Sequence, residues 1–184
     1  MIWLILGLVL WSAAHLFKRV LPGPRAALGN KGRGLVALGV LVSLGLMIMG
    51  YRVAETEVLY ALPMWTWHLN NAAMLIALFL MDIGRVRGIV RTKVRHPMLW
   101  GVTIWAAAHL LVNGDTASLV LFGGLGLWAL VEMAVINRAE GPWTPPERGS
   151  YAKDGMMFAA ALALYAAIAA VHYWLGYPVI AFLN

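Results

Sequence analysis

The sequence predicts an all-α integral membrane protein, a bundle of six transmembrane helices with both chain termini on the extracytoplasmic side. Three observations predict it: the composition, six apolar segments of helical length, and the distribution of Lys and Arg. Of 184 residues, 62% are hydrophobic and 12% charged, whereas an ordinary soluble domain is roughly 25% charged. The length fits a single membrane domain, residues 1–184, with no soluble domain attached.

The six predicted spans follow from segment length, because a helix needs about 20 mostly apolar residues to cross a bilayer. Six segments meet or approach this length, at about 1–18, 34–51, 64–83, 97–113, 116–136 and 156–175. The first has no basic residue before its apolar run and no clear cleavage site after it, so we expect a retained span. Only Asn-Gly-Asp-Thr separates the fourth span from the fifth, which predicts a tight hairpin with Asp115 as the helix cap.

The basic residues predict the orientation of these spans. Of the 14 Lys and Arg residues, 13 lie in the connections after the first, third and fifth spans, and only Arg52 lies on the opposite side. The positive-inside rule places the basic connections in the cytoplasm and both termini outside it. The same rule explains the net charge of +6 better than nucleic-acid binding does. We therefore expect membrane lipids, and no nucleic acid, among the partners.

Candidate chemistry centres on histidine, because a chain without cysteine has no disulfides, thiolate metal sites or thiol catalysis. A six-residue phrase occurs twice, as WSAAHL at 11–16 and as WAAAHL at 105–110. In each, a tryptophan precedes a histidine by four residues, about one helical turn. Ionisable groups inside a membrane are costly, so each such histidine is a functional candidate.

The small side chains beside these histidines leave a flat helix surface on which a flat macrocycle could lie. Neutral imidazole is a common ligand of haem iron, and helical bundles hold such cofactors in their cores. The residues therefore predict a haem site. We expect His15 and His109 as metal ligands, Asn113 bonded to the second ring nitrogen of His109, and a lining of Trp11, Ala14, Trp105 and Ala108.

The ligand pairing stays open at this level. On the span limits above, His15 and His109 differ in depth by about 10 Å, and His68 lies closer in depth to His109. A non-haem metal on three histidines is an alternative, as is a histidine that only bonds across helices. His96 lies about 140° around its helix from His109 and should not share its metal. Glu132 and Asp82 could equally snorkel or pair with the basic connections.

The stretch 95–124 resembles the NnrU family of bacterial inner-membrane proteins, through RHPMLWG, then WAAAHLLVNGDTAS, then LFGG. The resemblance implies a multi-pass protein of the bacterial inner membrane. The family is related to the plastid 15-cis-zeta-carotene isomerase, a membrane haem b protein that isomerises a carbon–carbon double bond without net redox change. This relationship implies haem b on His15 and His109 and a lipophilic polyene as substrate. Ala106 stands where the isomerase has a cysteine, so a thiolate exchange is not implied here.

Three further readings remain. The family name refers to nitrite and nitric oxide reductase gene expression, which implies a link to nitric oxide metabolism. A second reading is a non-catalytic haem or assembly subunit, in which both histidines stay bound. The RHP motif followed by NRAEGPW and GSYAKDG is also similar to membrane methyltransferases that bind S-adenosylmethionine. Here Leu99 replaces their tyrosine and a single Glu140 replaces their pair of glutamates.

Overall fold

The computed structural model describes residues 1–177 and residue 179. The described chain is helical, without a named strand, and its one isolated β-bridge pairs Val58 with Asp115. Six long helices and one short helix follow each other along the chain. A 3-10 turn lies in the connection between the third and fourth long helices. They are α1 (Ile2–Val20), α2 (Pro22–Ala27), α3 (Lys31–Arg52), α4 (Trp65–Ile83), η1 (Val90–Thr92), α5 (Pro97–Val112), α6 (Thr116–Glu140) and α7 (Tyr151–Trp174).

The six predicted segments therefore coincide with six helices, each displaced by a few residues at its ends. Among the described residues, four helices are long and apolar enough to cross a membrane: α1, α3, α6 and α7. Helix α5 is apolar but has 16 residues, and α4 carries four polar residues in its first half, Thr66, His68, Asn70 and Asn71. The all-helical class and several membrane-type helices are confirmed, and the count of six spans stays a prediction.

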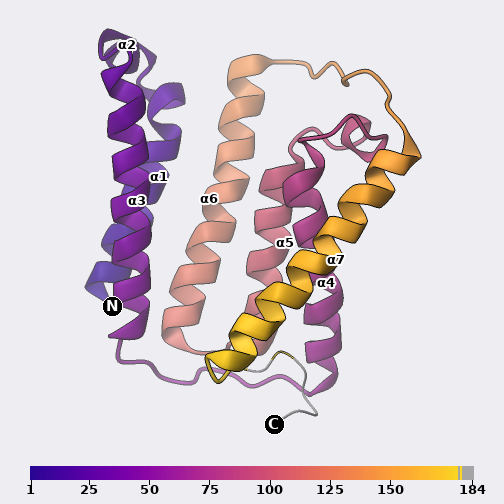
Figure 1. Cartoon of the computed structure of the whole chain (residues 1–184). Helices are drawn as coiled ribbons and strands as arrows, with labels where there is room; N and C mark the ends of the chain where they lie inside the picture. The colour runs from indigo at the N-terminus through magenta and orange to yellow at the C-terminus, as the bar shows by residue number, and fades with distance from the viewer. Residues whose placement is uncertain (178, 180–184) are drawn as a thin grey trace.

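The long helices stand side by side and run alternately up and down (Figure 1). Helix α1 packs on α3, α5 packs on both α4 and α6, and α7 packs on α4. Helix α6 is the most enclosed, with eight buried residues against two in α7. Its residues Leu125, Trp128 and Ala129 form a buried apolar cluster with Leu4 and Met47. Large apolar side chains cover the outside of the bundle, as expected for a surface in contact with lipid.

One end of the bundle carries the basic connections. Met1 and the last turn of α7 lie at one end, and the connections between α1 and α3, α4 and α5, and α6 and α7 lie at the other (Figure 1). The latter end, which we call the basic end, holds 13 of the 14 Lys and Arg residues. The chain terminus at Asn184, for which an extracytoplasmic location was predicted, lies outside the described residues. This arrangement agrees with the charge pattern.

Glycine allows α1 and α3 to cross in close contact. A Cβ atom at Gly50 would lie 2.7 Å from the backbone Cα of Leu4, and one at Gly7 would lie 2.9 Å from the carbonyl oxygen of Ser43. Both neighbours are backbone atoms, which cannot move aside alone. Small residues at membrane helix contacts serve this purpose, since they let the backbones approach.

We expect Gly50→Ala to lower the stability of the purified protein by roughly 1–3 kcal/mol, because the added methyl group forces α1 and α3 apart. Gly45→Ala is the matched control on the same helix, since a Cβ there meets no atom within 4 Å. Thermal unfolding in detergent, followed by circular dichroism, measures both. Equal midpoints for the two variants would contradict this account of the crossing.

Candidate functional site: two histidine–aromatic triplets

Each repeated phrase places its histidine against its own tryptophan. In α1 the rings of Trp11 and His15 lie with centroids 4.2 Å apart, and in α5 those of Trp105 and His109 lie 4.8 Å apart. This one-turn contact was predicted from the spacing and is confirmed. It follows from the helix geometry, which brings residues i and i+4 to one face.

The same helical turn fixes the tautomer of each imidazole. Nδ1 of His15 lies 2.9 Å from the carbonyl oxygen of Trp11, and Nδ1 of His109 lies 2.9 Å from that of Trp105. A carbonyl oxygen only accepts hydrogen bonds, so Nδ1 donates in both and the neutral ring keeps its lone pair on Nε2. An unprotonated Nε2 is the form of histidine that binds a metal ion. In both side chains the Nδ1 atom is used within the helix and Nε2 is left without a hydrogen bond to the described residues.

Helix α6 supplies a third aromatic ring to each pair. Trp128 lies 4.8 Å from the ring of His15 and 5.3 Å from that of Trp11. Phe122 stacks on His109 at 4.4 Å and 24° and meets Trp105 at 5.1 Å. We call these groups the His15 triplet and the His109 triplet. Sequence reasoning missed the α6 members, although both lie in the segment with the strongest motif match or directly after it.

The two triplets are separate in the structure. Phe122 and Trp128 are six residues apart on α6, which corresponds to about 9 Å along the helix and about 120° around it. Within the described part of the chain, no hydrogen bond or aromatic contact joins His15 to His109. The difference in depth estimated from the sequence thus reappears in the structure, and the pairing of these two ligands stays a prediction.

The other histidines have different surroundings. His68, the alternative partner, is exposed on α4. His96 lies at the start of α5, and its Nε2 is 2.8 Å from Oδ1 of Asn137. His172 on α7 repeats the bond seen in the triplets, with Nδ1 2.9 Å from the carbonyl oxygen of Ile168. Across the described residues, no three His, Cys, Asp or Glu side chains are grouped to hold a metal ion, so the structure does not assemble a three-histidine site.

Three expectations about neighbouring residues need correction or refinement. Asn113 does not bond the ring of His109; its Nδ2 donates to the backbone oxygen of His109 at 2.9 Å, because the ring nitrogen is already used and the helix end offers free carbonyls. Ala14 faces α3, where its Cβ would lie 3.5 Å from a Cβ on Gly39. Ala108 is buried at 2% exposure. That Ala14 and Ala108 line a haem site stays a prediction.

Several polar atoms near His15 are buried without a partner. Nε1 of Trp11, Nε1 of Trp128 and Oε2 of Glu132 are buried and make no hydrogen bond to the described residues. Glu132 follows Trp128 by one turn on α6 and is 9% exposed, so the expectation that it snorkels or pairs with the basic connections is wrong. Buried polar atoms without a hydrogen bond are costly. Of the five such side-chain atoms in the described residues, three belong to these residues around His15.

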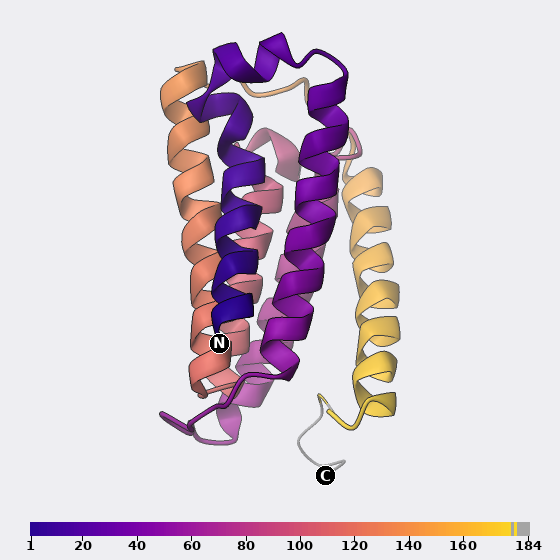
Figure 2. The ribbon, with the colours of Figure 1, turned by 90° about the vertical axis from the view of Figure 1, so that its left-hand side faces the viewer.

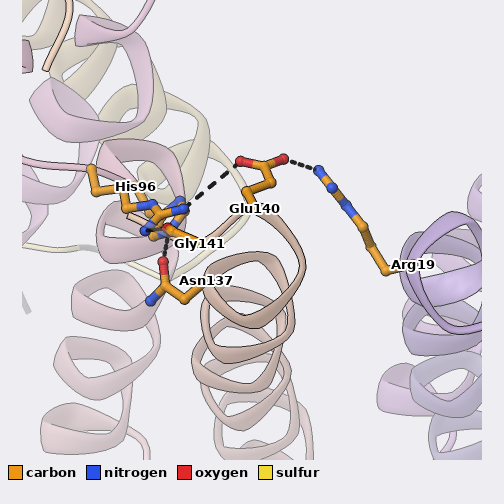
Figure 3. A network of polar contacts seen from close by, with 6 residues as sticks. Arg19, His96, Asn137, Glu140 and Gly141 are labelled. Carbon is orange, nitrogen blue, oxygen red and sulfur yellow. Dashed lines mark hydrogen bonds and ion pairs between the residues drawn. The ribbon is translucent and has the colours of Figure 1, made fainter. Parts of the chain in front are cut away.

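A second set of polar contacts closes the basic end (Figure 3). Glu140, the last residue of α6, accepts from Nη2 of Arg19 at 2.7 Å and lies 3.9 Å from Nη2 of Arg95. Nη1 of Arg95 also donates to the carbonyl oxygen of Gly141 at 2.8 Å. Together with the bond between His96 and Asn137, these contacts tie α1 and the start of α5 to the end of α6. The RHP motif thus has a structural role beyond starting a helix.

Comparison with known proteins gives one match. The chain matches no curated protein and no solved structure. The family model described as NnrU protein matches residues 3–179, which include all the long helices, both triplets and the contacts at the basic end. The chain therefore belongs to the NnrU family.

Proposed function

We propose that this NnrU protein binds haem b in the membrane through His15 and His109. The observation that carries the proposal is the same in both repeated phrases: an imidazole fixed by its own helix with an unprotonated Nε2. The aromatic rings of the triplets offer flat apolar surfaces that suit a macrocycle, and the unsatisfied polar atoms near His15 suit a ligand with polar groups. The donor set of neutral imidazoles in a helical bundle fits haem iron.

When bound, the haem supplies a metal centre that can activate a conjugated double bond or bind a small gas. The proposed activity is cis–trans isomerisation of a lipophilic polyene, or a role linked to nitric oxide metabolism. In either case this chain's residues hold and orient the imidazoles and exclude water with apolar side chains. His15 and His109, both partly buried, would hold the iron of the haem.

The direct test is the colour of the purified protein. A Soret band with about one haem per polypeptide, measured by the pyridine haemochrome method, supports the proposal. A colourless protein expressed with ample haem would contradict it. Turnover of a cis-polyene in detergent or liposomes then separates an isomerase from a haem subunit without catalysis, in which both histidines stay bound and the output is electron transfer or support for assembly.

One observation favours a methyltransferase as second candidate. In the resembling methyltransferases, the RHP segment and a later glutamate pair bind S-adenosylmethionine, and here Arg95 and Glu140 do come together. Glu140, however, is already paired with Arg19, and the second glutamate is absent from the sequence. Binding of S-adenosylmethionine by a colourless protein would select this candidate.

We also propose that all six long helices span the bacterial inner membrane, with the basic end in the cytoplasm. The positive-inside rule and the gathering of the basic connections at one end (Figure 1) support this topology. The 16 residues of α5 reach about 24 Å, which is shorter than the bilayer core of roughly 30 Å. Part of the connection between α3 and α4 contacts the end of α5, where the backbone of Leu59 donates to the carbonyl oxygen of Gly114 at 2.7 Å. Tyr60 donates to the carbonyl oxygen of Leu110 at 2.6 Å.

We expect alkaline phosphatase fused after Gly114 or after Asn184 to be active, because the enzyme folds only outside the cytoplasm. Green fluorescent protein at the same positions should be dark. Fusions within residues 142–149, at the basic end, are the control and should give the opposite pattern. Phosphatase activity at the basic end, with none after Gly114, would overturn the orientation.

A further inference from the structure

A hollow at the basic end has a strongly positive lining. It has a volume of about 450 Å³ and lies between the end of α1, the short helix α2 and the start of α3. Three cationic side chains line it, Lys18, Arg25 and Arg33, and no acidic residue does. None of the three belongs to an ion pair within the described residues. Neighbouring Arg19, by contrast, is neutralised by Glu140 at 2.7 Å.

The position of the hollow matches the level of lipid headgroups. Helices α1 and α3 are both long and apolar enough to cross a membrane, and α2 lies across their ends (Figure 2). Beside the cations, Val20, Leu21 and Leu28 are 60%, 50% and 38% exposed. A group of cations next to exposed apolar side chains complements a ligand with a negative head and an apolar tail.

We propose that this hollow binds the phosphate of an anionic phospholipid, such as phosphatidylglycerol or cardiolipin. Arginine binds phosphate oxygens in a bidentate manner, and basic pockets between membrane helices at the headgroup level bind anionic lipids. The apolar rim favours a lipid over free inorganic phosphate, which has no tail to bury. A bound lipid would also join α1 to α3 through α2, at the end of the helix that carries His15.

Native mass spectrometry of the full chain, released from detergent micelles with defined additions, tests the site. Dioleoyl-phosphatidylglycerol should remain bound, and dioleoyl-phosphatidylcholine should not. Replacing Lys18, Arg25 and Arg33 together by Gln should weaken phosphatidylglycerol binding by roughly fivefold for each cation, on the order of a hundredfold in all. Each single variant is measured as well, so that the result does not depend on the triple variant folding.

A triple variant elsewhere on the basic end is the matched control. Replacing Arg87, Lys93 and Arg138 by Gln removes the same charge outside the hollow and should leave binding within about twofold. Equal losses in both triple variants would show attraction to the whole basic end and would overturn the site. Unchanged binding in the Lys18, Arg25 and Arg33 variant would do the same. Displacement of the lipid by millimolar inorganic phosphate would assign the hollow to a free anion instead.

Discussion

His109→Ala is expected to abolish stoichiometric haem binding while the protein still inserts into the membrane. The substitution removes the Nε2 lone pair that the bond between Nδ1 and Trp105 keeps available. Changes to residues that only support a metal ligand typically cost 10–100-fold in affinity, so loss of the ligand itself should cost at least roughly tenfold. Insertion depends on the total apolar length of the helices and not on one imidazole.

The measurement is haem per polypeptide after purification in detergent, with membrane expression followed by immunoblot. His96→Ala is the matched control, because His96 is a histidine at the start of the same helix, α5. Its side chain bonds Asn137 and lies outside both triplets. Normal haem content in His109→Ala would contradict the assignment of His109 as a haem ligand. Loss of haem in both variants would point to a general loss of folding, which the expression level and the helical circular dichroism would reveal.

The long helices were predictable because each contains an apolar run, and charged or turn residues lie between these runs. Asp115 was predicted as the cap of α6, and its Oδ1 does accept from the backbone of Ser118 at 2.9 Å. The short helix α2 was missed, because Pro22 and Pro24 in LPGPRAA suggest a loop. Proline is tolerated in the first turn of a helix, where both lie.

Helix α6 also continues to Glu140, four residues beyond the predicted span. The apolar run ends earlier, so hydropathy alone could not reveal the extension. Its polar last turn is stabilised by partners far away in sequence, with Asn137 bound to His96 and Glu140 bound to Arg19. Such contacts depend on how the helices are arranged in space, and a pattern within one helix does not contain that information.

The same distinction applies to the site. The contact between each tryptophan and its histidine lies within one helix turn, so its spacing was enough to predict it. Phe122 and Trp128 join the triplets through packing between helices, and Glu132 is buried for the same reason. A carboxylate in the fifth apolar segment was visible in the sequence, but only the packing of α6 at the centre of the bundle shows that it is enclosed.

His15→Ala is expected to lower haem affinity, or to change a six-coordinate spectrum to a five-coordinate one, whereas His68→Ala should do neither. His15 is held between Trp11 and Trp128 with its Nε2 unprotonated. His68 is exposed on α4, and nothing in the described contacts orients its ring. A fixed imidazole binds a metal with a smaller loss of side-chain entropy than a free one.

Ultraviolet–visible and resonance Raman spectra of the purified variants report the coordination number, and haem titration of the apoprotein reports the affinity. His172→Ala is the informative control, because His172 has the same bond between Nδ1 and a carbonyl oxygen but lies outside both triplets. If the aromatic triplet matters in addition to the tautomer, His172→Ala should resemble the unmodified protein. The opposite result, with His68 required and His15 dispensable, would mean that depth in the membrane decides the pair, and that the repeated phrase reflects helix packing alone.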